Sequence, residues 1–348
     1  ADLALTRWAP NLNAEALAFL PNGPEGLAAS TRDGLLLLDD KGAELARFKG
    51  NFSSLDTRAA GAQVLVATLD NQRQQAMLIS LDSAGKRWGA PLYLPTRDYP
   101  VNGVCLYRDS AANLFVFLVG EEGKGEQWLV GNGPTLLARP QRVRGLPLPP
   151  SAQFCQVDDA ANQLLVNEQN VGWWAYPAHP EAEVKRTPVA LFDNPGRAAG
   201  AMALVPGGLV ALDPKTAQLQ LFQQDGERWV AQPSLHLPGV KEAENLAIKG
   251  RQLLLRDDDS GNLYQAELTW QATPVAPLPV LPEVAAQRQT DPVGRQGDAA
   301  DDPAIWIHPQ RPAQSRVLGT NKKQGLLAYD LDGKLLQELA VGRLNNVD

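Results

Sequence analysis

The sequence predicts an all-β fold built from repeated strand meanders, and three observations lead to this prediction. The 348 residues include 30 glycines and 27 prolines, which recur throughout and divide the chain into short pieces. Between them lie short apolar runs that mostly end in Asp, Asn or Gly, as strands followed by turns do. The strand-and-turn unit recurs about every 40–50 residues, which is the period of a propeller blade.

The expected strands follow one another without a long helical pattern. In chain order they occupy residues 34–40, 63–70, 76–82, 113–120, 163–169, 207–213, 218–226 and 251–268. We interpret Asp257, Asp258 and Asp259, inside the last run, as a solvated turn rather than a metal site. Strand after strand joined by short turns favours an all-β architecture.

One repeat is far longer than a blade, because residues 321–348 align with residues 30–56. The matched pairs are Gly34 with Gly325, Leu35 with Leu326, Leu36 with Leu327, Asp39 with Asp330, Gly42 with Gly333, Leu45 with Leu336, Gly50 with Gly342, and Asp56 with Asp348. The matched residues are separated in sequence by far more than one blade, which indicates that one domain ends and a second copy begins. We place the boundary near residue 285, giving domains 1–285 and 286–348. The proline-rich segment 273–284 suits a stiff, extended connector.

Composition argues against several kinds of partner. The formal net charge is −7, and residues 286–348 are balanced in charge, so the acidic excess lies in residues 1–285. We therefore predict no nucleic-acid partner. No apolar run approaches the ~20 residues of a membrane helix, so we predict no membrane partner. The chain begins at Ala1 without methionine, as a secreted or periplasmic protein does after signal removal, and we expect export.

Cysteine and histidine are scarce. Two cysteines and three histidines, with no C-x-x-C motif, do not favour zinc or thiol chemistry, so a site here should use oxygen ligands. Cys105 and Cys155 occupy similar places in successive strand units, and we expect them to lie close together. In an exported protein they could form a disulfide. The alternative is a pair of buried thiols that act as small apolar residues.

The stretch GDAADDPAIWIHP (297–309) places three aspartates within five residues, directly before a predicted strand. Asp301 and Asp302 supply two carboxylates, and Pro303 fixes the backbone that aims them. Carboxylates and backbone carbonyls are the ligands of calcium, so a hard-cation site is one interpretation. The alternative is an Asx turn that leads into the strand.

The motifs GDAADDPAIW (297–306), TNKKQGLLAYDLDGK (320–334) and GRLNNVD (342–348) resemble the opening of the β-propeller phytases. This resemblance implies a six-bladed propeller that hydrolyses phytate, or other inositol phosphates, with a Ca²⁺ cluster. It implies that Asp301 and Asp302 are calcium ligands and that Pro303 and Val347 offer backbone carbonyls. Lys322 and Lys323 would contact phosphate. Without the surrounding motifs, the two lysines would be interpreted as a solvated hairpin tip.

Residues 1–285 resemble the same family more weakly, and the site positions differ. Asn13 and Ala14 stand where the two aspartates should be, and Thr31 and Arg32 replace the two lysines. Further replaced positions are Asn102, Glu121, Gln153 and Ala199. The resemblance therefore implies a six-bladed propeller without catalytic residues, followed by an isolated first blade of a second, catalytic-type propeller.

The leading hypothesis is a tandem phytase whose N-terminal domain is an accessory. The 348-residue chain alone would be inactive, because one blade carries too few ligands. An alternative is that residues 1–285 form a non-enzymatic binding or scaffold module. A hydrolase with another residue set ranks last, since no Ser-His-Asp arrangement is visible. We also expect residues 286–348 to pack on a partner, either the first domain or another copy of the chain, because a lone sheet is marginal in water.

Overall fold

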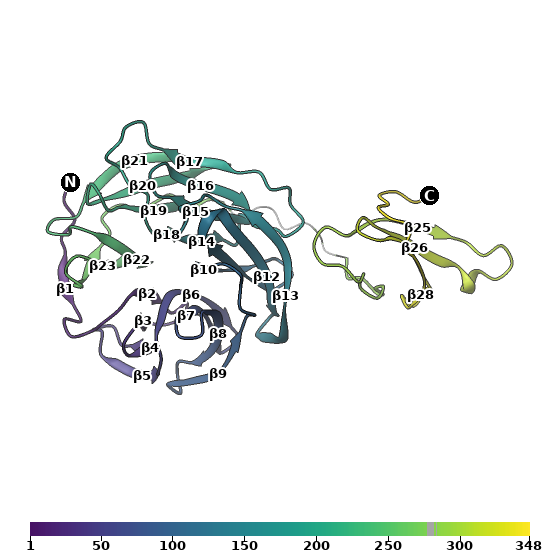
Figure 1. Cartoon of the computed structure of the whole chain (residues 1–348), viewed down its shortest axis with the longest axis horizontal. Helices are drawn as coiled ribbons and strands as arrows, with labels where there is room; N and C mark the ends of the chain where they lie inside the picture. Colours follow the sequence, from purple (N-terminus) through teal and green to yellow (C-terminus); the bar gives the residue numbers. More distant parts are fainter. Residues whose placement is uncertain (277–281, 283) are drawn as a thin grey trace. The chain divides into compact units, whose positions relative to one another are not determined.

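The computed structural model describes residues 1–276, 282 and 284–348, and it confirms the all-β prediction (Figure 1). The described residues form seven four-stranded antiparallel sheets and two short 3₁₀ helices, η1 (Glu121–Gly123) and η2 (Pro312–Gln314). None of the helices in the described part of the chain has the length or apolar character to span a bilayer.

The chain divides into two compact units. The first unit comprises Ala1–His179 and Glu183–Ala276, and the second comprises Pro180–Ala182 and Pro277–Asp348. The division falls inside the proline-rich segment 273–284, somewhat before the predicted boundary near residue 285. Part of that segment lies outside the described residues, so the stiff connector stays a prediction.

Five sheets of the first unit each use four strands that are consecutive in sequence. They are β2 (Ala16–Phe19), β3 (Gly26–Ser30), β4 (Gly34–Leu38) and β5 (Glu44–Phe48); β6 (Phe52–Ala60), β7 (Gln63–Asp70), β8 (Gln75–Asp82) and β9 (Arg87–Tyr93); β10 (Val101–Arg108), β11 (Asn113–Gly120), β12 (Lys124–Asn132) and β13 (Thr135–Pro147); β14 (Cys155–Asp158), β15 (Gln163–Glu168), β16 (Gly172–Pro177) and β17 (Thr187–Leu191); and β18 (Met202–Val205), β19 (Gly208–Asp213), β20 (Gln218–Asp225) and β21 (Arg228–His236). The predicted strands within these sheets agree with the observed bounds to within about two residues.

The remaining sheet of this unit joins the two ends of the unit. It consists of β22 (Ala243–Lys249), β23 (Gln252–Asp257), β24 (Leu263–Glu267) and the N-terminal strand β1 (Thr6–Trp8), which pairs antiparallel with β24. The predicted run 251–268 thus contains two strands joined by a turn. The first strands of neighbouring sheets contact one another in a ring, β2, β6, β10, β14, β18, β22 and back to β2. This is a propeller-like arrangement. The ring of sheets is closed, so that every sheet has a neighbouring sheet on both sides.

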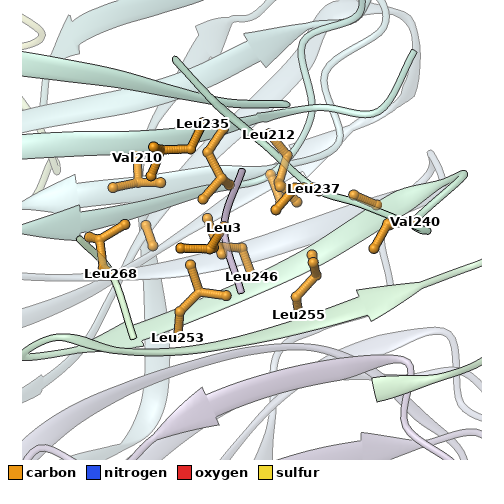
Figure 2. Close-up of a cluster of buried hydrophobic side chains, with 14 of the residues drawn as sticks. Leu3, Val210, Leu212, Leu235, Leu237, Val240, Leu246, Leu253, Leu255 and Leu268 are labelled. Atoms are coloured by element: carbon orange, nitrogen blue, oxygen red, sulfur yellow. The ribbon is translucent and has the colours of Figure 1, made fainter. Parts of the chain in front are cut away.

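Leucine-rich strands are buried on both faces because each sheet packs between two others. In β4, Leu35 and Leu37 belong to the cluster shared with the β6–β9 sheet. Leu36 and Leu38 point to the opposite face, into the cluster shared with β1, β23 and β24. Figure 2 shows the corresponding cluster between the β18–β21 sheet and the last sheet of this unit, with Leu3 at its centre. An unbroken apolar run is therefore the pattern expected of these strands.

The seventh sheet belongs to the second unit and has the order β25 (Ala300–Trp306), β26 (Arg316–Asn321), β27 (Gly325–Tyr329) and β28 (Leu335–Leu339). It reproduces details of the β2–β5 sheet, as the long repeat predicts. Gly34 and Gly325 both have positive φ, and a Cβ at either would lie 2.0 Å from a carbonyl at the end of the fourth strand. Asp39 and Asp330 both accept two backbone N–H groups in the next turn.

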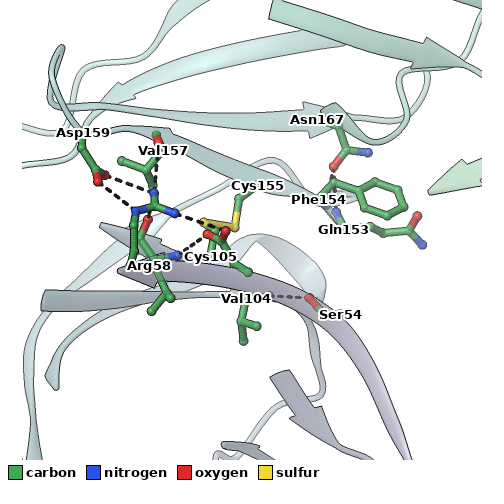
Figure 3. The surroundings of a disulfide bond; sticks show 12 residues. Ser54, Arg58, Val104, Cys105, Gln153, Phe154, Cys155, Val157, Asp159 and Asn167 are labelled. Carbon is green, nitrogen blue, oxygen red and sulfur yellow. Dashed lines mark hydrogen bonds and ion pairs between the residues drawn. A yellow bond between two sulfur atoms is a disulfide. The ribbon is translucent and has the colours of Figure 1, made fainter. Parts of the chain in front are cut away.

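Cys105 in β10 and Cys155 in β14 form a disulfide, with their Cα atoms 5.8 Å apart (Figure 3). Their predicted proximity is confirmed, and the alternative of two free thiols is wrong. The bond joins the first strands of two neighbouring sheets across a separation of 50 residues. Both residues are buried, because first strands of adjacent sheets pack together around the axis of the unit.

The interpretation of Asp257–Asp259 as a solvated turn is wrong for Asp257, which is only 2% exposed. Its carboxylate accepts the backbone N–H groups of Glu242 and Asp259 and the hydroxyl of Ser260. Asp257 thus ties the turn to the residues that precede β22. A charge run in sequence does not reveal this, because the N–H donor of Glu242 comes from 15 residues earlier.

Candidate functional site

A bulge at the start of β25 presents the two predicted calcium ligands. Ala300 pairs with Asn321 and Pro303 pairs with Gly319, so Asp301 and Asp302 together face the single residue Thr320. A bulge of this kind bends the strand and re-aims side chains. The backbone N–H of Asp302 donates to Thr320 Oγ1 (2.9 Å), and this contact fixes the bulge.

The carboxylate of Asp302 lies next to the C-terminal segment. The backbone N–H of Val347 donates to Asp302 Oδ2 (2.9 Å), and Thr320 Oγ1 donates to the carbonyl of Asn345 (2.8 Å). These contacts bring Asp302 and Val347 together, and their role as ligands of one calcium site stays a prediction. The part that Val347 plays is nevertheless that of an N–H donor to the carboxylate.

Lys322 lies at the β26–β27 turn between two carboxylates. Its Nζ is 3.0 Å from Asp298 Oδ1 and 3.4 Å from Asp301 Oδ1. The hydrogen bond to Asp298, together with the charges of both aspartates, raises the pKa of Lys322 above its ordinary value. Sequence reasoning gave Asp298 no role. The signal was present, since Asp298 is the first of the three aspartates in GDAADD.

Lys323 faces a different partner. Its Nζ donates to the carbonyl of Gln296, and its backbone N–H donates to Asn321 Oδ1 (2.9 Å). The structure therefore pairs Asp301 with Lys322 and Asp302 with Val347. Lys323 lies in the same turn as Lys322, but its Nζ contacts a neutral carbonyl. Pro303 lies in the part of β25 that pairs with β26.

The residues present fit a hard cation in chemistry but fall short in number. Asp298, Asp301 and Asp302 offer carboxylate oxygens, which calcium prefers. Asn321, whose backbone pairs with Ala300 in β25, is 0% exposed, and its Nδ2 group has no hydrogen-bond partner. Within the described ranges, no group of three or more His, Cys, Asp or Glu side chains is placed to hold a metal ion. The site as it stands is thus a partial ligand set.

The equivalent place in the first unit is neutral. Asn13 Oδ1 accepts a hydrogen bond from Ser30 Oγ (2.9 Å), and Ser30 Oγ also accepts the backbone N–H groups of Arg32 and Asp33. Ala14 is buried and offers no ligand. The side chain of Arg32 turns to Asp33. The substitutions seen in the sequence therefore replace a charged cluster by a turn whose polar groups form hydrogen bonds with one another.

The first unit has a central cavity of about 820 Å³, lined by the first strands of its six sheets. Asn102 and Gln153 line it, whereas Glu121 lies in the exposed helix η1 and Ala199 is buried. The carbonyl of Ala199 accepts a hydrogen bond from Asn167 Nδ2 (2.9 Å), which links two sheets. Two of these four replaced positions thus face the cavity, and two do not.

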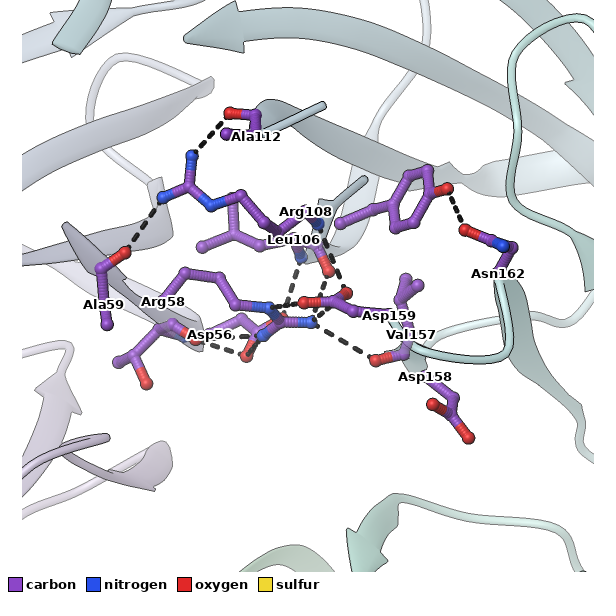
Figure 4. A network of polar contacts seen from close by, with 12 residues as sticks. Asp56, Arg58, Ala59, Leu106, Arg108, Ala112, Val157, Asp158, Asp159 and Asn162 are labelled. Carbon is purple, nitrogen blue, oxygen red and sulfur yellow. Dashed lines mark hydrogen bonds and ion pairs between the residues drawn. The ribbon is translucent and has the colours of Figure 1, made fainter. Parts of the chain in front are cut away.

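Arg58 is the hub of a network that sequence reasoning missed (Figure 4). Its guanidinium contacts Asp56 and Asp159, at 3.2 and 2.8 Å, and donates to the carbonyls of Leu106 and Val157. Burial raises the pKa of Asp56, an effect that the charge of Arg58 opposes. Because every nitrogen of Arg58 has an acceptor, the network fastens β6, β10 and β14 together and leaves little capacity for a ligand.

A second arginine gathers carboxylates at the wall of the cavity. Arg256 Nη1 donates to Glu244 Oε2 (2.5 Å) and Asp258 Oδ1 (2.6 Å), and Arg256 Nη2 is 3.6 Å from Glu15 Oε1. Partial burial and the neighbouring charge of Asp258 raise the pKa of Glu244 to about 7. Two of these carboxylates, Glu15 and Glu244, line the cavity and leave this part of its wall unfavourable for a polyphosphate.

Comparison with known proteins supports the resemblance at the C-terminal end. Residues 269–348 match the family described as Phytase. A 66-residue C-terminal stretch is 56% identical to a 3-phytase of Bacillus subtilis (strain 168). That stretch covers 19% of this chain and 17% of the relative, so only a small part of the curated relative is represented here. The predicted resemblance to the phytases is confirmed for this segment.

Solved structures resemble the chain in fold. The aldose sugar dehydrogenase of Streptomyces coelicolor, in its PQQ-bound form, has a TM-score of 0.52 at 16% identity, with 76% of this chain and 98% of that chain covered. A glucose dehydrogenase-type oxidoreductase of Thermus thermophilus has a TM-score of 0.51 at 14% identity, with 76% and 99% covered. At such identities the likeness concerns the fold alone.

Proposed function

We propose that residues 286–348 supply the first blade of a calcium-dependent phytase acting on phytate or other inositol phosphates. In this proposal residues 1–285 form an accessory six-bladed propeller without catalytic residues. The observation that carries it is the cluster of Asp298, Asp301 and Lys322, next to Asp302 and Val347, inside the segment that matches the family.

The chemistry of the cluster suits phosphate monoester hydrolysis. Calcium, when bound, would neutralise the phosphate and favour ionisation of the attacking water. Asp301 and Asp302 would hold that cation through carboxylate oxygens. Lys322 and Lys323, at the adjoining turn, add positive charge for the phosphate oxygens. Val347 fixes the Asp302 carboxylate by donating its N–H to Oδ2.

The accessory role of the first unit is supported by what replaces the site residues. The turn at Asn13 and Ser30 satisfies its own polar groups and holds no carboxylate pair. The acidic wall at Glu244 disfavours a polyphosphate in the central cavity. The disulfide between Cys105 and Cys155 supports export to an oxidising compartment, since cytosolic thiols are kept reduced.

The sharpest test transplants the site into an active relative. The 66-residue C-terminal stretch of this chain that matches the B. subtilis 3-phytase replaces the corresponding stretch of that enzyme, and phosphate release from phytate is measured with and without calcium. We expect calcium-dependent activity, and a loss of at least about 100-fold in an Asp301→Asn, Asp302→Asn variant of the hybrid. A folded hybrid that is inactive, or active without these aspartates, would contradict the proposal.

The isolated 348-residue chain should release no phosphate from phytate above background, even at millimolar calcium. Its carboxylates are too few to hold calcium firmly, and catalysis needs several cations fixed around one phosphate. Turnover comparable to that of a complete phytase would show that the first unit takes part in the chemistry.

A second candidate function is non-enzymatic ligand binding by the first unit. The central cavity of about 820 Å³ favours it, because it is large enough for a small molecule. Calorimetric titration of the chain with myo-inositol and with phytate distinguishes the two ideas. Binding of either compound that is unchanged by Asp301→Asn and weakened by Gln153→Ala would favour the cavity over the C-terminal cluster.

A further inference from the structure

The central cavity of the first unit runs along the first strands of its sheets. Where the ring closes, β2 and β22 lie side by side and run parallel. Near their starts, Asn245 Nδ2 donates to the carbonyl of Glu15 (2.5 Å), and near their ends, Lys249 Nζ donates to the carbonyl of Leu20 (2.8 Å). The cavity therefore has a first end at the starts of these strands and a second end where they finish.

The middle of the cavity is largely apolar, with Leu17, Val104 and Leu246 among its lining residues. In β22, Glu244 at the first end and Lys249 at the second are five residues apart, or roughly 16 Å along an extended strand. A methylene chain can be buried along such a surface, as the stems of lysine side chains are, provided that its polar groups reach the two ends. The cavity thus suits a long, narrow ligand.

The first end of the cavity is short of positive charge. Glu15 and Glu244 line it, and both are paired with Arg256. The same guanidinium also contacts Asp258. In the part of the chain that the structure describes, no other cation lies within ion-pair distance of Glu15 or Glu244. One guanidinium therefore balances three carboxylates, and this end attracts a further positive charge.

Two neutral side chains at the same end are available to a ligand. Asn102 and Gln153 line the cavity, and neither side-chain amide forms a hydrogen bond with another described residue. An ammonium group carries donors only, and amide oxygens accept hydrogen bonds. The two amides thus complement the carboxylates of this end as acceptors without adding charge.

Asp158 supplies a carboxylate at the second end. Its Oδ1 accepts one backbone N–H of the following turn, and Figure 4 shows the carboxylate pointing away from Arg58. The charge of Arg58 is already matched by Asp56 and Asp159. Lys249 also lies at this end, where backbone carbonyls hold its Nζ. Of the charged residues that line the whole cavity, five are acidic and two are basic, so the lining favours a cation.

We propose that the central cavity of the first unit binds a linear polyamine. One ammonium group lies between Glu15 and Glu244, within reach of the amide oxygen of Gln153. The methylene chain occupies the apolar middle, and a second ammonium group reaches Asp158. This inference rests on the second candidate function and names the chemical class of its ligand.

Other classes of ligand fit the lining less well. A phosphate ester would meet the unbalanced carboxylates of the first end. A single metal ion cannot reach both acidic ends, and among the described residues no group of three or more His, Cys, Asp or Glu side chains is placed to hold one. An uncharged sugar or polyol would leave the negative charge of the lining uncompensated.

The test titrates spermidine into the whole chain at low salt and follows binding by calorimetry. Triethylene glycol, an uncharged chain of the same length, is the control ligand. The titrations are made at pH 8, above the pKa of about 7 of Glu244, so that this carboxyl group is ionised. We expect spermidine to bind and triethylene glycol to show no detectable binding.

Matched substitutions locate the first ammonium group. We expect Glu15→Gln and Glu244→Gln each to weaken spermidine binding about three- to tenfold, because each removes one partly exposed charge that contacts the ligand. Glu267→Gln removes the same charge from β24, but this side chain is 73% exposed and lies outside the cavity lining. Its affinity for spermidine should change by less than about twofold.

Asp158→Asn tests the second end. We expect it to weaken spermidine binding about two- to fivefold. Asparagine keeps an oxygen for the backbone N–H of Ala161, so the turn should be retained. Thermal unfolding shows whether each variant is folded. If a glutamate variant unfolds, Asp158→Asn and the comparison of the two ligands still decide the question.

Four results would overturn the inference. These are equal affinities for spermidine and triethylene glycol, equal losses in Glu15→Gln and Glu267→Gln, no binding at about 1 mM spermidine, and binding that is lost in an Asp301→Asn, Asp302→Asn variant. The last result would place the polyamine in the second unit.

The outcome is separable from the other proposals. Myo-inositol that binds in the cavity while spermidine does not would refute the ligand class and leave the second candidate function standing. The hybrid phytase contains no part of this cavity, so its activity bears on the proposed phytase function alone.

Discussion

The β2–β5 sheet and the β25–β28 sheet carry the same sequence repeat, yet their surroundings differ. Leu17 in β2 is 5% exposed, whereas its counterpart Ile305 in β25 is 69% exposed. Both sheets keep the glycine at the start of the third strand and the aspartate that caps the next turn. Local signals therefore build the sheet, and neighbouring sheets decide how much of it is buried.

The two sheets also differ in the polar side chains at one end, where the exposed sheet carries charged groups and the buried sheet carries neutral ones. In the buried sheet, Asn13 and Ser30 form a neutral pair. In the exposed sheet, Asp298, Asp301 and Lys322 form a charged cluster that is open to solvent. One copy thus gains stability from packing, while the other keeps the groups that chemistry would need.

The largest expected difference between the two units comes from the disulfide. Reduction of Cys105–Cys155 should destabilise the first unit by about 4 kcal/mol, the amount that loop entropy predicts for 50 residues. The chain holds no other cysteine, so the second unit should be unaffected. Thermal unfolding with and without a reducing agent measures this. A melting temperature of the first unit that stays the same in a reducing agent would contradict the bond.

Matched truncations of Leu17 and Ile305 sharpen the comparison at one equivalent position. Leu17→Ala should cost about 2–4 kcal/mol because it leaves a cavity between packed sheets. Ile305→Ala should cost less than about 0.5 kcal/mol because the side chain is mostly in water. Chemical unfolding of both variants gives the two values. Similar losses would mean that the face of β25 is covered in solution, as expected if it packs on a partner.

The smallest expected effect concerns pH and Glu244. Its pKa in the folded protein, about 7, lies above the ordinary value of 4.5, so the folded state holds a proton that the unfolded state has lost. The stabilisation is complete below pH 4.5 and disappears as pH rises through 7. With the side chain 41% exposed, the effect should stay below about 1 kcal/mol.

Glu244→Gln measures that contribution. The variant should lose less stability than the wild type between about pH 5 and pH 8, as followed by unfolding at each pH. Lys322→Gln is a suitable control, because it alters a charge in the other unit. Parallel pH profiles of the wild type and Glu244→Gln would show that the carboxyl keeps its ordinary pKa.

Much of the fold could be predicted because its signals are local. Strands such as 63–70 and 113–120 are bounded by turn residues on both sides, and the structure has β7 and β11 at these residues. The cysteine pair was predictable in position, since equivalent strands of successive sheets lie side by side. Its oxidation state was not, because spacing alone does not distinguish a disulfide from two thiols.

The candidate site was less predictable because its contacts cross the sequence. The pairing of Lys322 with Asp298 spans 24 residues, and the bond from Val347 to Asp302 spans 45. Arg58 reaches Asp159, 101 residues away, and no motif marks that contact. Residue types could be assigned from the sequence, but the partners depend on which strands and turns each folded unit brings together.

The pairing of β1 with β24 has a consequence for synthesis. Thr6 is made well before its partner Gln265, which is made only when nearly the whole unit has been synthesised. The ring therefore stays open until β24 has been made, and β1 stays unpaired until then. Contacts of such long range slow folding and expose strand edges meanwhile. A nascent chain of this protein should consequently depend on rapid synthesis of residues 243–267, or on a chaperone that shields β1 until they arrive.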